Sequence, residues 1–363
     1  NLGYYFEGGM LVDEENELTS FWGQYDPDTK EALFSDSVKL VNEDYIIYAD
    51  TLKYHTGSKY ADILGPSRIV SDSGYVHTSK GWYNTVTEDA RLLDRSEVYS
   101  SDGTKVLIGD TILYNRLSGE GEVFGNMYLE DKTRKAILQG NYGFYNEKTE
   151  YGLATDSAFA IDYSQEESMF LHGDTLVMKT DSTFRDIRAY HEVRFYRSDI
   201  LGDRIDLLLN DSTLEKAVIR DYAFAIQDRG TPDQYNQLSG RDMTAYFRGG
   251  ELYHLLVEGN AQSLYYLLQK DSTIIGLNKT ESPYLSMDIE KNQIKRLKLW
   301  STTTAVTTPL PQLKEGESRL EGFVWLDYLR PTGPDDLFRD NERKASEATE
   351  QRPRRFRREE ITL

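Results

Sequence analysis

One short pattern of apolar, small and polar positions recurs along the chain. The copy at residues 47 to 54 reads IYADTLKY and the copy at residues 107 to 114 reads LIGDTILY, each with a small residue third and Asp fourth. Further copies are centred on Gly140, Gly173, Gly202 and Gly240, and Gly81 marks a degenerate one. The small residues of the clear copies lie 60, 31, 33, 29 and 38 positions apart. The chain therefore repeats about every 30 residues.

The facing of the apolar residues changes within each copy. Apolar residues occupy the position two before the small residue and the positions three and five after it. Because a straight strand alternates its faces at every residue, both sets share one face only if the strand bends or bulges at the Gly-Asp step. Glycine gives room for such a bend. We therefore expect each repeat to turn a corner around a shared apolar interior, lined by Ile47, Leu52, Tyr54, Leu107, Ile112, Tyr114, Leu138, Tyr145, Leu171, Leu176, Met178, Ile205, Leu207, Leu238 and Met243.

Each repeat is predicted to hold two to three short β-strands and little helix. Turn residues separate the copies, as at Asn115 and at residues 248 to 250 (RGG). Gly, Asp, Thr, Tyr and Asn dominate the repeats, and the spacing of three and four residues that marks an amphipathic helix is not sustained. The sequence therefore predicts an all-β, elongated and repetitive antiparallel structure over residues 1 to 300.

The repeat ends near residue 300. Residues 301 to 330 begin with an irregular connector that contains Pro309 and Pro311. They continue with LEGFVWLDYLRP, whose aromatic residues are expected to cap the last repeat or to anchor a partner. Residues 331 to 363 are strongly charged and include RPRRFRR, so we expect this tail to be extended or disordered.

Two kinds of interior fit the repeat. The inward residues can fill a closed core, as in a β-sandwich, or they can line an open trough. The repeated Tyr54, Tyr114 and Tyr145 favour a trough with a wet mouth, because a buried tyrosine hydroxyl needs a hydrogen-bond partner. The pattern itself leaves both interiors open.

Composition and motifs exclude several classes of function. The chain carries 42 Lys and Arg against 61 Asp and Glu, a net charge of −19 spread along its length, which argues against nucleic acid as a partner. It has no cysteine, which excludes disulfides, Cys-ligated zinc and thiol nucleophiles. Its five histidines stand singly, and His191-Glu192 lacks the second histidine of a zincin motif. We therefore predict no catalytic residues, no metal site and no cofactor.

Several stretches carry a resemblance to a known family. They include YYFEGGMLVDEENEL at residues 4 to 18, ALFSDSVKLV at residues 32 to 41 and GNYGFYNEKTEYGLATD at residues 140 to 156. The chain resembles, over residues 1 to 330, the OstA-like proteins of Bacteroidota, which are related to the periplasmic lipopolysaccharide-transport protein LptA. The resemblance implies a β-jellyroll, or β-taco, that holds lipid A acyl chains inside and leaves the sugars outside. Family members place strands before the YYFEGG phrase, so the first copy of the groove is expected to be incomplete.

The resemblance also implies a role. A protein of this kind is periplasmic, associates with the outer membrane and carries or bridges lipopolysaccharide, lipooligosaccharide or a related lipid. Its expected partners are that lipid, an outer-membrane protein complex, and other β-jellyroll transport proteins that pair with its edge strands. Two alternatives stay open: a structural subunit of an outer-membrane assembly with a filled interior, and an envelope enzyme such as a glycan hydrolase. The enzyme would need two inward carboxylates in an open cleft.

Overall fold

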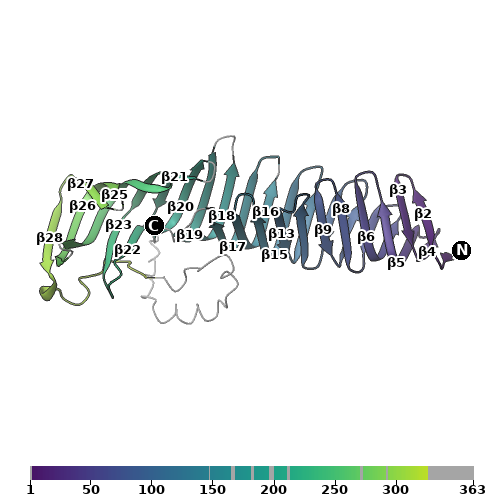
Figure 1. Cartoon of the computed structure of the whole chain (residues 1–363), viewed down its shortest axis with the longest axis horizontal. Coiled ribbons are helices and arrows are strands. Elements are labelled where there is room, and N and C mark those ends of the chain that lie inside the picture. Colours follow the sequence, from purple (N-terminus) through teal and green to yellow (C-terminus); the bar gives the residue numbers. More distant parts are fainter. Residues whose placement is uncertain are drawn as a thin grey trace, which may run out of the picture.

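The strands form one long row (Figure 1). The computed structural model describes residues 2–146, 148–164, 168–180, 184–195, 200–210, 213–269, 273–291 and 293–325. Neighbouring strands pair antiparallel along the whole row, and the one helical element of these residues is a 3₁₀ turn at Leu310–Gln312. The predicted all-β, elongated and repetitive antiparallel fold is confirmed. The charged tail expected at residues 331 to 363 lies outside the described residues.

The strands follow one another along the row in chain order. The first ten are β1 (Gly3–Tyr5), β2 (Gly9–Asp13), β3 (Asn16–Ser20), β4 (Trp22–Asp26), β5 (Glu31–Val41), β6 (Tyr45–His55), β7 (Tyr60–Ile63), β8 (Ser67–Ser71), β9 (Gly74–Thr78) and β10 (Gly81–Asn84). The next nine are β11 (Asp89–Leu92), β12 (Ser96–Ser100), β13 (Lys105–Gly109), β14 (Thr111–Asn115), β15 (Glu120–Asp131), β16 (Ala136–Asn146), β17 (Tyr151–Asp162), β18 (Met169–Thr180) and β19 (Phe184–Phe195). The last nine are β20 (Ile200–Asn210), β21 (Thr213–Arg220), β22 (Ala223–Asp228), β23 (Tyr235–Gly240), β24 (Asp242–Arg248), β25 (Glu251–Leu268), β26 (Ile274–Glu290), β27 (Gln293–Trp300) and β28 (Thr304–Pro309).

Each pass of the chain bends once near its middle. Strands β16 and β17 pair on both sides of the bend, and their register shifts between Gln139 and Tyr142. In shorter passes the bend is a break, as at Asp110 between β13 and β14. The bends fold the sheet along a line, which we call the crease, into two facing half-sheets. Half-sheet A holds β8, β9, β12, β13, β22 and β23, half-sheet B holds β7, β10, β11, β14, β21 and β24, and long strands such as β15 to β20 contribute to both.

Successive strands have alternately one and two residues at the crease. In β15, Gly125 and Asn126 have φ values of 78° and 48°, and they lie opposite the single residue Asp110. The Asp110 N–H donates to the Gly125 carbonyl over 3.0 Å. Asp156 and Ser157 form the same left-handed pair in β17. The predicted change of facing lies in the strands with one corner residue: Gly109 and Ile112 both face the interior although they are three positions apart across Asp110. The β-bulge of β15 keeps the alternation, because Val123 and Met127, four positions apart, both face inward.

Glycines lie at the crease because the two half-sheets meet there. A Cβ on Gly109 would lie 2.2 Å from a side-chain carbon of Val123, and a Cβ on Gly240 would lie 2.3 Å from one of Val257. Both valines belong to the opposite half-sheet. These glycines thus permit close approach, whereas the residues with positive φ belong to the neighbouring strands.

We expect Gly240→Ala to lower the free energy of unfolding by about 1–3 kcal/mol, because the added methyl overlaps Val257 and forces the half-sheets apart. The matched control is Gly121→Ala, whose Cβ would meet its nearest atom at 3.8 Å. Urea unfolding of the two variants checks this. Equal losses of unfolding free energy in the two variants would show that the half-sheets can accommodate the added methyl at Gly240.

The interior between the half-sheets contains two apolar clusters. The first surrounds Ile47, Leu52 and Tyr54 near the N-terminal end, among β3, β5, β6 and β7. The second includes Ile112, Leu176 and many other residues and extends from β11 to β26. Buried apolar side chains therefore lie between the half-sheets from β3 to β26, in two separate clusters.

Candidate functional site

Cross-strand register places all fifteen predicted interior residues in three rows. The row of half-sheet A contains Ile47, Leu107, Leu138, Leu171 and Leu238, joined through Ile69, Val76, Val98 and Leu129. On half-sheet B, the deep row next to the crease contains Leu52, Ile112, Leu176, Ile205 and Met243. Farther from the crease, the rim row contains Tyr54, Tyr114, Tyr145, Met178 and Leu207. The positions two before, three after and five after the small residue thus correspond to one row each.

The rim row alternates large and small side chains in its middle part. Gly121 pairs with Tyr114 on one side and with Tyr145 on the other, and Gly152 follows next to Tyr145. A Cβ at Gly121 would have no neighbour closer than 3.8 Å and one at Gly152 none closer than 3.5 Å, so a Cβ fits at both positions; Gly121 is half-buried and Gly152 is buried. Sequence reasoning did not single out these two glycines. Their 31-residue separation, which equals the repeat, was the available signal.

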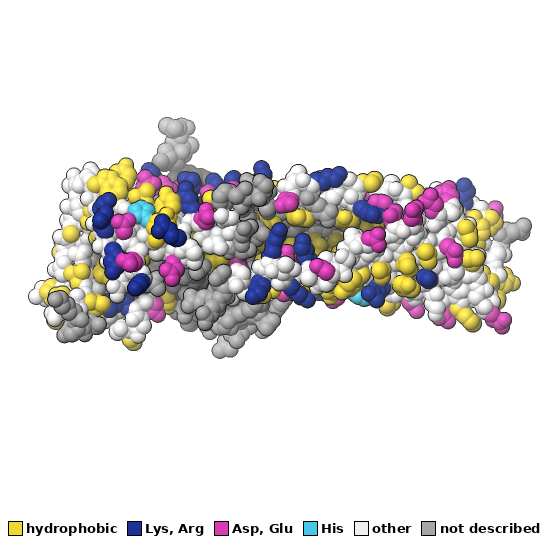
Figure 2. Space-filling view, turned by 45° about the horizontal axis from the view of Figure 1, so that its top comes forward, with side chains coloured by type: hydrophobic (Ala, Val, Ile, Leu, Met, Phe, Trp, Pro, Cys, Tyr) yellow, Lys and Arg dark blue, Asp and Glu magenta, His cyan; other side chains and the backbone are white. Residues whose placement is uncertain are grey.

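The groove is open in its middle and closed toward both ends. Tyr114 and Tyr145 are 37% and 40% exposed, and Leu107 and Leu138 are only partly buried. By contrast, Tyr54 and Leu207, which belong to the same rim row toward the two ends, are 0% and 5% exposed. Figure 2 shows hydrophobic side chains in the floor of a hollow in the middle part of the molecule. The rim row is thus most exposed in the middle of the molecule, while the deep row below it, with Ile112 and Leu176 at 3% exposed, is buried.

The side of half-sheet A that faces this opening carries small and polar residues. Its row farthest from the crease starts with the buried Tyr45 and continues along the opening with Ser71, Gly74, Ser100, Lys105, Asp131 and Ala136. The same row reaches Met169, which is again buried, at β18. The large side chains at its two ends and the small ones between them explain where the two half-sheets touch and where they stay apart.

A polar network, which we call the latch, closes the groove near the N-terminal end. Lys59 Nζ, on the turn after β6, donates to Asp13 Oδ2 of β2 over 2.8 Å, and both side chains are mostly buried. The hydroxyl of Tyr54 donates to the same carboxylate over 3.0 Å and accepts from Asn16 Nδ2 over 3.2 Å. The ring of Tyr45 packs edge-on against Tyr83 of the opposite half-sheet, at 4.8 Å between centroids. The latch therefore ties the two half-sheets together across the mouth.

The latch changes the interpretation of one predicted residue. The three groove tyrosines were expected at a wet mouth, and Tyr114 and Tyr145 are indeed part-exposed. Tyr54 is instead fully buried, and its hydroxyl is satisfied by Asn16 and Asp13. The repeat marks the position of the tyrosine in the rim row, while its partners on β2 and β3 decide its exposure.

The latch predicts sensitivity to alkali. Burial raises the pKa of Tyr54 to about 12, from an unfolded value of 10, because the phenolate is poorly solvated there. Between these values the unfolded chain loses the proton and the folded chain keeps it, so stability present below pH 10 is lost as the pH rises through about 12. Two pKa units correspond to about 2–3 kcal/mol. Urea unfolding at pH 8 to 11.5 should give a shallower fall for Tyr54→Phe than for the unmodified chain, and parallel curves would count against this role.

Large apolar side chains close the other end. Phe195 and Ile200 extend the row of half-sheet A, and Leu209, Leu214 and Phe247 lie at the strand ends of half-sheet B. All five are at most 6% exposed and belong to the second interior cluster. This part of the interior is filled by the protein's own side chains.

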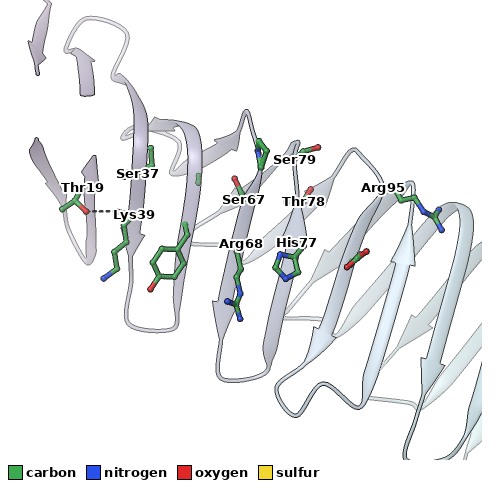
Figure 3. A pocket seen from close by; sticks show the side chains of 14 residues that line it. Thr19, Ser37, Lys39, Ser67, Arg68, His77, Thr78, Ser79 and Arg95 are labelled. Carbon is green, nitrogen blue, oxygen red and sulfur yellow. Dashed lines mark hydrogen bonds between the residues drawn. The ribbon is translucent and has the colours of Figure 1, made fainter. Parts of the chain in front are cut away.

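A shallow depression on the outer face of half-sheet A is separate from the groove. Lys39, Tyr48, Arg68, His77 and Glu97 stand in one row across β5, β6, β8, β9 and β12 (Figure 3). The Lys39 ammonium lies over the Tyr48 ring, and the Arg68 guanidinium lies over the ring of Tyr75. These charges and the open shape suit a polar surface. An acyl chain would not be shielded from water there.

The folded sheet and its apolar groove define the class of the protein, a β-jellyroll of the β-taco type. Residues 1–50 match the family model described as OstA-like protein, which confirms the predicted resemblance for this part of the chain. A comparison with curated proteins found no match.

The described residues contain neither a membrane-spanning helix nor a metal-binding cluster. Within them, no helix has the length and apolar character to span a membrane. Within the same residues, no group of three or more His, Asp or Glu side chains is placed to hold a metal ion. The groove is lined by apolar side chains, with the tyrosine hydroxyls of the rim row beside them.

Proposed function

We propose that the protein binds acyl chains of a lipopolysaccharide or lipooligosaccharide in the open middle of the groove, and carries or bridges this lipid through the periplasm to the outer membrane. The observation that carries the proposal is the exposure of the rim row in the middle of the molecule, where the part-exposed Tyr114 and Tyr145 pair with Gly121. The OstA-like match of residues 1–50 supports a role in lipid transport.

Burial alone supplies enough binding energy for this role. Each methylene removed from water contributes about 0.8 kcal/mol, so eight buried methylenes contribute about 6 kcal/mol. Tyrosine suits the boundary between buried chains and a wet headgroup, because its ring is apolar and its hydroxyl polar. The exposed Lys105, Lys132 and Lys148 lie at the strand ends and turns beside the opening and are placed to attract an anionic headgroup. The proposed role needs no catalytic group and no cofactor.

The N-terminal edge of the row supports the proposed partners. In the described residues β1 pairs with β4 and β2 with β3, and these pairs lie at the end of the row. Tyr4, Phe6 and Val12 on this edge are 63 to 66% exposed. Unpaired edges bind further strands. We propose that another β-jellyroll transport protein pairs here and that the chain joins an outer-membrane protein complex.

A structural subunit of an outer-membrane assembly is the second candidate. The observation in its favour is the packing of the interior toward both ends, where Ile47, Ile205 and Met243 are fully buried by protein side chains. Under this alternative, the opening would hold water or a protein segment in place of lipid.

A photo-crosslinking pair tests the proposal. Tyr145 faces the groove, and Phe144, its neighbour in β16, faces the opposite side of half-sheet B. We expect benzoylphenylalanine at Tyr145 to capture lipopolysaccharide in cells and the same probe at Phe144 to capture none. A lipid extract of the purified protein, analysed by mass spectrometry, should contain the same lipid. Equal capture at both positions, or an extract without lipid, would favour the structural subunit.

A further inference from the structure

The depression on the outer face of half-sheet A has the size and the lining of a binding site. It is open and has a volume of about 830 Å³, and small-molecule sites range from about 300 to 1,000 Å³. Side chains from four paired strands line it: Lys39 of β5, Tyr48 of β6, Arg68 of β8 and His77 of β9. Since the groove lies on the other face of this half-sheet, acyl binding in the groove leaves these side chains unused.

Two cations of the depression have no carboxylate partner among the described residues. Lys39 Nζ lies 5.9 Å from the centre of the Tyr48 ring, and the Arg68 guanidinium lies 5.1 Å from that of Tyr75. A tyrosine ring attracts a cation without neutralising its charge. Glu97 is the one carboxylate among the described residues that line the depression, and it lies at the far end of the row, on β12. In a chain with a net charge of −19, Lys39 and Arg68 therefore form a local positive site.

The cations are spaced along the face by the distance between strands. Lys39 and Arg68 stand two strands apart in one cross-strand row, and His77 follows on the next strand (Figure 3). With about 4.8 Å between strands, the backbone positions of the two cations are about 10 Å apart, and the row as far as His77 spans about 14 Å. The site therefore suits an extended ligand with separate anionic groups better than one compact anion.

The groups between and beside the cations suit a sugar. Tyr48 stands between Lys39 and Arg68 in the row and is 45% exposed. Its ring is apolar and carries a hydroxyl at the edge, and a sugar ring has a complementary apolar C–H face with hydroxyls around it. Ser37 and Thr19 add two more hydroxyl groups to the lining. A nucleic acid, by contrast, would be repelled by the charge of the whole chain.

We propose that this face of half-sheet A binds an anionic glycan, a chain of sugars that carries phosphate or carboxylate groups. Arg68 binds one anionic group through its planar guanidinium, and Lys39 binds a second one as a point charge. Tyr48 lies against the sugar between them. The glycan is the sugar part of the lipid proposed for the groove or a lipid-free chain, and both present the same chemistry to these side chains. The site does not depend on acyl binding in the groove.

Charge variants of the full chain test the site in calorimetric titrations with the phosphorylated core oligosaccharide of lipopolysaccharide, freed of its lipid. We expect Lys39→Gln with Arg68→Gln to weaken binding about tenfold, because two charged contacts with the ligand are lost. The matched control is Lys216→Gln with Arg248→Gln. These two cations also lie over tyrosine rings, but on the outer face of half-sheet B, and their loss should leave the affinity unchanged. Equal affinities of the two double variants, both folded by circular dichroism, would overturn the proposal.

Ligand controls separate a glycan from other partners. A neutral dextran oligosaccharide of the same length should not bind. Vesicles of phosphatidylglycerol and phosphatidylethanolamine, which carry negative charge without sugar, should not bind through this face. Vesicle binding that falls in Lys39→Gln with Arg68→Gln would assign the face to a membrane and overturn the glycan.

Intact lipopolysaccharide identifies the source of the glycan. If the lipid supplies it, lipopolysaccharide binding falls in the Lys39→Gln and Arg68→Gln variant together with oligosaccharide binding. If a lipid-free chain supplies it, oligosaccharide binding alone falls. Both results support the site, whereas a variant that keeps full affinity for the oligosaccharide contradicts it whatever the groove binds.

Discussion

The double variant Gly121→Leu and Gly152→Leu is expected to lose lipid binding while the protein stays folded. Both glycines lie in the rim row beside Tyr145, and a Cβ at either position would meet only ordinary van der Waals neighbours. Each leucine therefore fits the fold and fills space above the groove floor. If the pair displaces three or four methylenes of an acyl chain, binding weakens by about 2.4–3.2 kcal/mol, which is about 60- to 200-fold.

The control for this double variant is Glu122→Leu. Glu122 follows Gly121 in β15 and faces outward, toward Leu113 and Phe144. The Glu122→Leu substitution places a leucine in the same strand as Gly121, on the face away from the groove. Lipid that co-purifies with each variant is quantified by mass spectrometry against protein. Undiminished lipid in the double variant, with the fold intact, would move the binding site away from the middle of the groove.

The sequence predicted the rows because they depend on local geometry. Strand facing alternates strictly, so the shift in facing at Gly109 and its equivalents was enough to predict a bend and a shared inward facing for Leu107, Ile112 and Tyr114. Their division into three rows comes from the cross-strand register. The role of the glycine in the bend was not predicted correctly. It looked like the flexible point of the bend, whereas it gives space to Val123 of the opposite half-sheet, a contact set by the folding of the sheet.

The open and closed parts of the groove could not be predicted for the same reason. The latch joins Asp13 to Lys59 and Tyr45 to Tyr83, pairs that are 46 and 38 residues apart and belong to different copies of the repeat. Nothing in one copy marks these contacts. The small residues that keep the middle open, Gly121 and Gly152, carry no chemistry of their own and become informative only beside the tyrosines with which they pair.

The interior also predicts how stability is divided along the row. Each bent strand touches mainly its neighbours, as in other repeat proteins, whose stability is nearly a sum of local terms. The cluster around Ile47 and the cluster around Ile205 are separate groups of buried side chains. The part-exposed Tyr114 and Tyr145 lie at the part of the second cluster that begins at β11, next to the first cluster. A lesion in one cluster should thus leave the other folded.

We expect Met243→Asp to unfold the C-terminal part of the row. Met243 is fully buried in the deep row between Ile219 and Val257, next to the crease at Gly240. Loss of its packing and burial of a carboxyl group together cost about 5 kcal/mol or more, which is comparable to the stability of a whole domain. Thr244→Asp, on the outward face of the same strand, is the matched control and should cost less than about 1 kcal/mol. Hydrogen exchange should show lost protection from β20 to β26 in Met243→Asp and unchanged protection in β3, β5 and β6, where the latch and the first cluster hold. Loss of protection along the entire row at once would mean that folding is transmitted between the two clusters, and the groove would then be a single cooperative unit.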